Sequence, residues 1–455
     1  MRHCTATATI IPAQVAAYAM TKRFDVVIVG AGILGTSIAY FLGHLNPSRE
    51  IAVVEQALRV AFHTSGRNTG KVHAPYLYDP KKKALTARAS FHGYAMWEEY
   101  SKNRGLPFKR DGVVEVAMDA DATGVLDRHL QWGMENGLGE DEIMLLDRAE
   151  MEKREPNVKC EAAIYCGRDA SVDYAAFTRA LGGDTTAAGV RFLLNTRATG
   201  ISRIDDGWNV TLDGEHEVEA GLLINAAGGE AVDLAHAAGV AKDLTDVHFR
   251  GEYWRAPAEY SGLTHSSVYS VPARPEYPFL DPHWIVRSDG TCEVGPNAVP
   301  VFSPYGYTGR ENARRLVPKM FEMLSSGARK MVFDRQFQKL ALGEVRSSLS
   351  KSAMIGRVQS FLPGIDPGRF TERGSAGIRS SVVDSGGHFV PDAVLAPGHS
   401  SFHILNYNSP GATGALPFAA HIVGRLGAEG LLKNEMEDAQ CGPWRFGEVA
   451  AHMAG

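Results

Sequence analysis

The hydrophobic pattern near the amino terminus predicts a β-α-β unit. Residues 24–29 form a nearly continuous apolar run, which is typical of a parallel strand buried on both faces. Residues 33–45 carry apolar side chains around most of a helical circumference and end shortly before Pro47, and residues 51–54 form a second apolar run. A strand, a helix and a strand in this order are expected to form two parallel strands joined by a helical crossover.

Three glycines lie at the turn between the first strand and the helix, in FDVVIVGAGILG. Gly30 permits a tight turn, Gly32 lets the backbone approach a pyrophosphate, and Gly35 lets the helix pack close to the strand. Glu55 follows the last glycine by 55 − 35 = 20 residues, where a carboxylate can bond ribose hydroxyls. Because a buried strand, a helix and this carboxylate accompany the glycines, we predict a nucleotide site rather than a tight turn alone.

The segment after Glu55 indicates a flavin rather than a nicotinamide nucleotide. A nicotinamide dehydrogenase would continue directly into further α/β units, whereas residues 61–75, AFHTSGRNTGKVHAP, are polar and contain glycine. We expect them to form a loop around the cofactor. The sequence has no second Gly-x-Gly-x-x-Gly, so the hydride is expected to come from the substrate itself and to pass to FAD.

Two later segments are predicted to return to the cofactor. Residues 221–229, GLLINAAGG, and 402–420, FHILNYNSPGATGALPFAA, each combine a short apolar strand with small residues, which let a backbone pass close to a ligand. A helix beginning in the second segment would direct its positive end at a reduced flavin. The predicted FAD contacts are Gly30, Gly32, Ile33, Leu34, Gly35, Glu55, Gln56, Thr64, Ser65, Gly66, Arg67, Asn68, Thr69, Gly70, Ala226, Ala227, Gly228, Asn408, Ser409, Pro410, Gly411, Ala412 and Thr413.

The segments between these cofactor motifs predict a second domain. Residues 109–118, 144–164 and 244–363 are rich in aromatic, β-branched and proline residues, as expected of a mixed or antiparallel sheet, and residues 288–290 predict a hairpin. The expected class is α/β, α+β overall, with a Rossmann-type FAD-binding domain interleaved with a substrate domain. The predicted division is an N-terminal extension at 1–22, an FAD-binding domain at 23–105, 168–243 and 370–432, a substrate domain at 106–167 and 244–369, and a C-terminal tail at 433–455.

The composition and charge of the chain bear on which partners the protein binds and in which compartment it acts. The chain of 455 residues is 44% apolar and 22% charged with a net charge of −5, an ordinary globular balance that argues against a nucleic-acid partner. Five scattered cysteines fit a reducing compartment, and we expect a cytoplasmic protein. No apolar run is long enough for an integral membrane segment, but a peripheral contact with the inner membrane stays open.

Two further features of the sequence are assigned no role in the chemistry. Residues 1–22 lack acidic side chains, and an upstream start codon ahead of a natural start at Met20 explains them better than a targeting peptide. His399 and His403 are four residues apart but have no acidic or cysteine partner nearby, so no metal site is expected.

Several sequence runs carry a family resemblance. They are the glycine motif with Glu55, HTSGRNTG at 63–70, FRGEYWR at 249–255, PFLDPHW at 278–284, VGPNAV at 294–299, LGEVRSSLSKS at 342–352, GIR at 377–379 and NSPGAT at 408–413. Across about residues 23–425 the chain resembles the FAD-dependent D-amino-acid-oxidase-like superfamily, and within it the L-2-hydroxyglutarate dehydrogenase and oxidase branch. The resemblance implies oxidation of a 2-hydroxy acid, with L-2-hydroxyglutarate or a related dicarboxylate as the first choice, and transfer of electrons to a quinone-like acceptor or oxygen.

The resemblance is weakest in the loop that is expected beside the substrate. Lys71 stands where the family has small apolar residues, and residues 75–79, PYLYD, stand where it has a glycine followed by paired tyrosines. Gly411 stands where the family usually has alanine. Lys71 and the altered tyrosines either change the acid that is bound or merely repack a loop.

Oxidation of a 2-hydroxy acid requires a cationic clamp for the carboxylate and a base for the hydroxyl proton. Arginine suits the clamp because its planar fork can pair both carboxylate oxygens, and Arg379 in GIR is the first candidate. Histidine suits the base because it titrates near neutral pH, and His73 at the end of the cofactor loop comes before His283. The further candidates for substrate binding are Arg250, Tyr253, Lys351 and Lys71.

Three alternatives accompany this prediction. His63, in FHTSG, could bond covalently to the flavin, as a histidine in a comparable place does in some relatives. The substrate could be an amino acid or a sarcosine-like amine instead of a hydroxy acid. The chain could also be a flavin-binding protein without catalytic activity, although the cationic and histidine candidates near the cofactor segments disfavour this.

Overall fold

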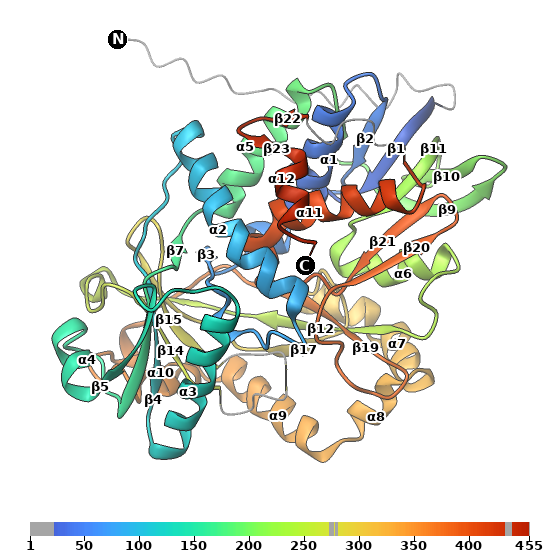
Figure 1. The fold of residues 1–455 in the computed structure, drawn as a ribbon. Helices are drawn as coiled ribbons and strands as arrows, with labels where there is room; N and C mark the ends of the chain where they lie inside the picture. Colours follow the sequence, from blue (N-terminus) through green and yellow to red (C-terminus); the bar gives the residue numbers. More distant parts are fainter. Residues whose placement is uncertain (1–21, 273–276, 278–280, 433–438, 455) are drawn as a thin grey trace, which may run out of the picture.

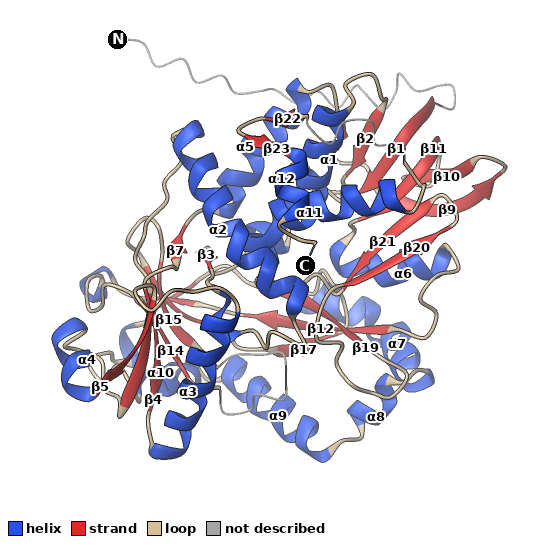
Figure 2. Cartoon of the chain, viewed as in Figure 1, coloured by secondary structure: helices blue, strands red, loops and turns tan. Residues whose placement is uncertain are grey.

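The computed structural model describes residues 22–272, 277, 281–432 and 439–454 of the chain. Two eight-stranded sheets and one three-stranded sheet, with helices packed around them, form the body of these residues (Figures 1 and 2). Except for Lys22, the predicted N-terminal extension lies outside the described residues.

The first eight-stranded sheet carries the predicted β-α-β unit. Its strands are β1 (Lys22–Val29), β2 (Ile51–Val54), β8 (Arg191–Leu193), β9 (Ala198–Ile204), β10 (Gly207–Leu212), β11 (His216–Asn225), β20 (Val394–Gly398) and β21 (Ser401–Leu405). The order is β20-β21-β11-β1-β2-β8, with β10 beside β11 and β9 beside β10. β1 pairs in parallel with β2 and β11, and β11 pairs in parallel with β21. Strands from three distant parts of the chain therefore end side by side at one edge, which confirms the interleaved Rossmann-type arrangement.

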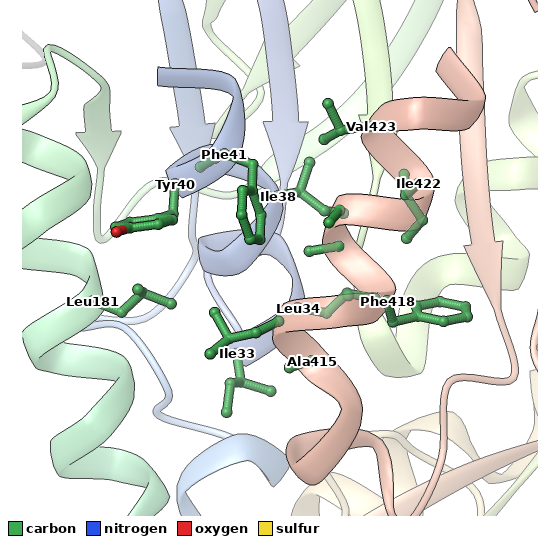
Figure 3. Packing of buried hydrophobic residues seen from close by; sticks show 14 of the residues in the cluster. Ile33, Leu34, Ile38, Tyr40, Phe41, Leu181, Ala415, Phe418, Ile422 and Val423 are labelled. Carbon is green, nitrogen blue, oxygen red and sulfur yellow. The ribbon is translucent and has the colours of Figure 1, made fainter. Parts of the chain in front are cut away.

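Helix α1 (Ile33–Leu45) lies between α5 (Tyr174–Ala187) and α11 (Gly411–Ala428) and packs against both. Figure 3 shows Ile38 of α1 on the side of α11, with Leu181 of α5 near Tyr40 on the other side. Because α1 is covered on both sides, it has no broad solvent-exposed face that would require polar side chains, which explains the apolar circumference seen in the sequence. This packing fixes the N-terminal end of α1 against the strand ends.

The second eight-stranded sheet is mixed, as predicted for the substrate domain. Its strands are β4 (Val113–Ala117), β5 (Ile143–Asp147), β6 (Ala162–Cys166), β13 (Trp254–Arg255), β14 (Ser267–Ser270), β15 (His283–Val286), β16 (Cys292–Gly295) and β18 (Glu372–Arg373), in the order β18-β13-β16-β15-β14-β4-β6-β5. β4 and β14 pair in parallel, and the other neighbours are antiparallel. The predicted hairpin joins β15 to β16 through Gly290, whose φ is +83°.

A three-stranded antiparallel sheet lies between the two eight-stranded sheets (Figure 1). It consists of β12 (Thr245–Gly251) between β17 (Val299–Val301) and β19 (Gly377–Val383). β18 and β19 fall in the span 370–432 that we assigned to the FAD-binding domain, yet they pair with strands from residues 245–301. The division into domain segments stays a prediction.

The structure corrects one feature of the predicted substrate domain. Residues 309–359, which we expected to belong to sheet, form the helices α7 (Gly309–Ser325), α8 (Ala328–Val332), α9 (Arg335–Leu349) and α10 (Lys351–Gln359). Caps that the sequence analysis overlooked begin three of them: Thr308 with Glu311 in a capping box, Asp334, and Ser350.

In the part of the chain that the structure describes, five further helices, a 3₁₀ helix in the loop after Glu55 and two pairs of two-residue strands accompany these sheets. They are the helices α2 (Ala84–Arg104), α3 (Ala120–Glu135), α4 (Arg148–Arg154), α6 (Ala231–Ala237) and α12 (Phe446–Ala451), the 3₁₀ helix η2 (Thr64–Gly66), and the strand pairs β3 (Lys71–Val72) with β7 (Ala170–Ser171) and β22 (Gln440–Cys441) with β23 (Trp444–Arg445). Among the described helices, none has the length and apolar character that crossing a membrane requires.

Candidate active site

The turn between β1 and α1 brings its glycines against neighbouring backbone. Gly30 has φ +106°, and a Cβ there would overlap the carbonyl oxygen of Ala226 at the end of β11. A Cβ on Gly35 would overlap the carbonyl oxygen of Gly30. Both positions therefore require glycine. Gly32 is the N-cap of α1 and has no side chain to cap the helix, and the first turn holds no acidic residue, so the positive end of the helix can receive a pyrophosphate.

Glu55 supports this turn from the end of β2. It is 8% exposed, and its two carboxylate oxygens accept hydrogen bonds from the backbone N–H groups of Ala31, at 2.9 Å, and Ala57, at 2.8 Å. Burial raises the pKa of Glu55, and the two N–H donors oppose that rise. Each carboxylate oxygen can accept a second hydrogen bond, so the predicted contact with ribose hydroxyls is compatible with this geometry.

The loop after Glu55 links α1 to β19. The hydroxyl of Ser65 accepts a hydrogen bond from the backbone N–H of Ile33 at 2.9 Å, at the start of α1. The hydroxyl of Thr64 donates to the carbonyl of Ile378 on β19 at 2.7 Å, and the amide of Asn68 donates to the carbonyl of Ser65 at 2.9 Å. The first part of the loop is thus tied to both α1 and β19, as expected of a segment wrapped around a cofactor.

The turn between β21 and α11 connects the C-terminal cofactor segment to the loop that bears His73. The Thr413 hydroxyl accepts a hydrogen bond from the backbone N–H of His73 at 3.0 Å and donates to the carbonyl of Lys71 at 3.3 Å. The indole N–H of Trp97 donates to the carbonyl of Ala412 at 3.0 Å. The first turn of α11 holds no acidic residue, so its positive end also suits negative charge.

These segments enclose a cleft with about 1420 Å³ of empty space, part of it open to solvent. The predicted cofactor residues that line the cleft are Gly32, Ile33, Leu34, Gly35, Thr64, Ser65, Arg67, Asn68, Thr69, Ala226, Gly228, Asn408, Ser409, Pro410, Gly411, Ala412 and Thr413. The others, Gly30, Glu55, Gln56, Gly66, Gly70 and Ala227, are not part of its lining.

Four residues predicted for substrate binding or catalysis line the same cleft, namely Arg379, Tyr253, His73 and Lys71. Arg379 lies on β19 opposite Phe249 of β12, and Tyr253 is 5% exposed. Burial raises the pKa of Tyr253, against the effect of nearby arginines that include Arg379. A cation, a histidine and a buried phenol therefore share one cavity with the cofactor segments.

Two other candidate cations are engaged outside the lining. The guanidinium of Arg250 donates to Glu252 at 2.7 Å and to the carbonyl of Gly306 at 2.9 Å. The ammonium of Lys351 donates to the carbonyl of Phe370 at 2.6 Å. Neither residue lines the cleft, which leaves Arg379 as the stronger candidate for a carboxylate clamp.

His283 and His63 also lie outside the cleft lining. His283 is 3% exposed with its ring centroid 4.2 Å from that of Tyr269, and burial, with the charges of Arg379 and His73, lowers its pKa to about 3. His63 lies with its ring centroid 4.8 Å from that of Tyr305, and burial lowers its pKa to about 4. Both histidines are therefore neutral at neutral pH, and His73 is the histidine candidate in the cleft wall.

Lys71 belongs to a buried charged cluster that the sequence analysis missed. Its side chain has no exposed surface, and its ammonium lies 3.0 Å from Asp111 Oδ1 and 2.7 Å from the hydroxyl of Ser171. A second carboxylate, Asp169, lies 4.0 Å from the ammonium and 3.3 Å from Nδ1 of His73. Pairing of β3 with β7 sets Lys71 directly opposite Ser171. The ammonium is thus held by the protein's own groups, which makes direct contact with a substrate less favourable.

The histidine pair noted in the sequence has other partners. His403 is hydrogen-bonded to the side chain of Asn225 at 3.0 Å and to that of Ser401 at 3.1 Å. Over the described ranges, no group of three or more His, Cys, Asp and Glu side chains is arranged to hold a metal ion.

Comparison with known proteins establishes the family. A family model described as FAD dependent oxidoreductase (DAO) matches residues 25–425. The chain belongs to this family. It is accordingly an FAD-dependent oxidoreductase, and the cleft fits that cofactor, because its α1 terminus begins at a glycine without acidic side chains in the first turn and two of its turn positions require glycine.

Curated relatives match over most of their length. The chain is 29% identical over 403 residues to an L-2-hydroxyglutarate dehydrogenase of Escherichia coli, covering 89% of this chain and 93% of the relative. It is 29% identical over 420 residues to the mitochondrial L-2-hydroxyglutarate dehydrogenase of Homo sapiens, covering 89% of both chains.

Solved structures share the fold. The dithionite-reduced, FAD-bound L-α-glycerophosphate oxidase of Mycoplasma pneumoniae superimposes with a TM-score of 0.71 at 21% identity, over 90% of this chain and 95% of that one. Glycine oxidase from Geobacillus kaustophilus gives a TM-score of 0.65 at 16% identity, over 94% and 99%. These neighbours are named for different substrates, so the fold alone does not select the substrate.

Proposed function

We propose that this enzyme oxidises a short 2-hydroxy dicarboxylic acid of the L-2-hydroxyglutarate class to the 2-oxo acid. The observation that carries the proposal is that Arg379 and His73 line the cleft formed by the cofactor segments. The names of the curated relatives support the choice of acid.

Each protein group has a defined task in this proposal. The Arg379 guanidinium pairs with the substrate carboxylate, and the buried Tyr253 lies in the same wall. His73 accepts the proton of the substrate hydroxyl while the hydrogen on Cα leaves with its electron pair. Bound FAD supplies the acceptor for that hydride. The predicted FAD-contacting residues hold the cofactor through the N-terminal ends of α1 and α11 and through the loop at residues 64–70.

The electron acceptor and the location belong to the same proposal. The reduced enzyme passes its electrons to a quinone-like acceptor or to oxygen, and the protein acts in the cytoplasm, with peripheral contact at the inner membrane if a quinone is used. The flavin is held without a covalent bond, because His63 lies outside the cleft lining between aromatic rings.

An anaerobic substrate screen tests the function. Holoenzyme is mixed without oxygen with L-2-hydroxyglutarate, its D isomer, other hydroxy acids, amino acids and sarcosine, and flavin absorbance is followed. We expect the L-2-hydroxy dicarboxylate to bleach the flavin. If only amines bleach the flavin, the enzyme oxidises an amine and the proposal of a hydroxy-acid substrate is wrong. If no compound bleaches the flavin, a flavin-binding protein without catalytic activity is favoured.

A further inference from the structure

Asp169 is a fully buried carboxylate next to the proposed base. Its side chain has no exposed surface, and Oδ2 lies 3.3 Å from Nδ1 of His73. Among the described residues, its other ion-pair contact is Lys71, with Nζ 4.0 Å from Oδ1, and neither carboxylate oxygen accepts a hydrogen bond of good geometry. A buried carboxylate without a partner is costly, so this group requires a donor close by.

Lys71 does not supply a hydrogen bond to Asp169: two of its three N–H donors are used elsewhere, and its Nζ lies 4.0 Å from Asp169 Oδ1, beyond hydrogen-bond distance. Its ammonium donates to Asp111 and to Ser171, and the Ser171 hydroxyl in turn donates to Asp111 at 2.7 Å. The group placed to serve Asp169 is therefore an N–H at Nδ1 of His73. A proton at Nδ1 leaves Nε2 as the acceptor of the neutral ring, and His73 lines the cleft.

We propose that Asp169 is a positioning residue, which holds His73 in the Nδ1–H tautomer and stabilises the imidazolium formed when Nε2 takes the substrate's hydroxyl proton. The inference rests on the proposed function, in which His73 is the base. The arrangement is a carboxylate–histidine pair in which the carboxylate keeps its charge while the ring gains and loses a proton.

The groups around His73 fit this charge assignment. The Thr413 hydroxyl accepts a hydrogen bond from the backbone N–H of His73, and the ring centroid of Tyr269 lies 6.2 Å from that of His73. The positive charge of Arg379 acts on the neighbouring His283 and disfavours its protonation. His283 stays neutral because burial lowers its pKa to about 3.

Among the described residues, the buried cluster beside the His73 ring contains two carboxylates, Asp111 and Asp169, and one ammonium, that of Lys71. Lys71 offsets only one of the two carboxylates Asp111 and Asp169. The carboxylate of Asp169 faces Nδ1 of His73 at 3.3 Å, where it is placed to accept a hydrogen bond from an N–H on that nitrogen.

The first test reads the tautomer directly. Nitrogen-15 NMR of histidine-labelled holoenzyme, with the His73 signals assigned by their loss in His73→Asn, reports which ring nitrogen carries the proton. We expect the Nδ1–H form above the pH at which the ring protonates. An Nε2–H ring in the wild type would overturn the proposal, and this measurement needs no folded Asp169 variant.

The second test is Asp169→Asn, followed by anaerobic flavin reduction across pH. We expect the rate constant for flavin reduction to fall about 10–100-fold with KM changed less than about threefold, as for loss of a partner that orients a histidine. The acid limb of the pH profile should move to lower pH by about one unit, because a neutral amide stabilises the imidazolium less than a carboxylate does. A merely structural role would not move this limb.

A matched control comes from a second buried carboxylate–histidine pair. Glu115 lies 2.9 Å from Nδ1 of His129, is 1% exposed and does not line the cleft. Glu115→Gln should leave the His73 tautomer and the acid limb as in the wild type. An equal shift in both variants, or an unchanged rate and limb in Asp169→Asn, would refute the assignment to Asp169.

The variant His73→Asn separates the two proposals. If it reduces the flavin as fast as the wild type, His73 is not the base and the proposed function fails at that residue. If it is slow while Asp169→Asn behaves as the wild type, only the positioning role of Asp169 fails.

Discussion

Replacing Arg379 by methionine should remove the carboxylate clamp with little change in the volume of the side chain. Arg379 is partly exposed on β19 and lines the cleft beside the buried Tyr253. Each hydrogen bond from a charged donor contributes about 1.5–3 kcal/mol, and a bidentate pair makes two. Because the cleft is partly open to solvent, we take about 3 kcal/mol for the pair, which corresponds to roughly a 100-fold loss of kcat/KM at about 1.4 kcal/mol per tenfold.

The assay is steady-state oxidation of L-2-hydroxyglutarate, with FAD content checked in each variant. Arg379→Lys keeps the charge but loses the planar fork, and should lose about tenfold in kcat/KM. Arg373→Met is the matched control, because Arg373 is 54% exposed on β18 and does not line the cleft, and it should stay within about twofold of the wild type. If Arg379→Met retained the wild-type kcat/KM, the clamp assignment would be wrong.

Three further predictions concern the cofactor and stability. Gly30→Ala should lose bound FAD on purification, because its Cβ would overlap the carbonyl of Ala226 at a φ of +106°, and a wild-type flavin-to-protein ratio would contradict this. Lys71→Met should lower the free energy of unfolding by about 3–5 kcal/mol, because it leaves Asp111 buried without its ion pair, and urea denaturation measures the loss. Unfolding free energy should fall as pH drops below about 6.5, the usual pKa of histidine, because burial holds the pKa of His283 at about 3 and the unfolded chain then binds more protons. The urea midpoint should therefore be lower at pH 5.5 than at pH 7.5, by a smaller margin in His283→Gln, and an equal margin in both proteins would contradict the assignment.

The cofactor side of the site could be predicted because its signals are local. The strand predicted at residues 24–29, the helix predicted at 33–45 and the turn glycines each follow from a short stretch of chain, and the structure contains them as β1 (Lys22–Val29) and α1 (Ile33–Leu45). The end of β11 and the start of α11 could also be found, because small residues after an apolar strand indicate backbone close to a ligand.

The substrate side depends on pairing between distant residues. Lys71 meets Ser171 through two-residue strands that have no detectable periodicity, and Asp169 reaches His73 by the same pairing. Nothing in the sequence around Lys71 shows that its ammonium is held by other side chains rather than offered to a substrate. Arg250 and Lys351 were candidates for the same reason, since their hydrogen bonds to Glu252 and to the carbonyl of Phe370 form only in the folded chain.

The helices at residues 309–359 were missed for a different reason. The aromatic and β-branched residues of the larger segment dominated its composition, while the start signals at Thr308, Asp334 and Ser350 are single residues. Caps are stronger evidence for a helix than average composition, because each one satisfies specific backbone N–H groups.

The central claim is that this flavoprotein takes a hydride from a 2-hydroxy dicarboxylic acid. It is tested most directly by anaerobic titration of the holoenzyme with L-2-hydroxyglutarate, monitored by flavin absorbance with analysis of the organic acid formed. The account predicts complete bleaching with one equivalent of 2-oxoglutarate formed per flavin, and no bleaching by glycine or sarcosine. An enzyme whose flavin stays oxidised with every 2-hydroxy acid but is reduced by an amine would contradict it.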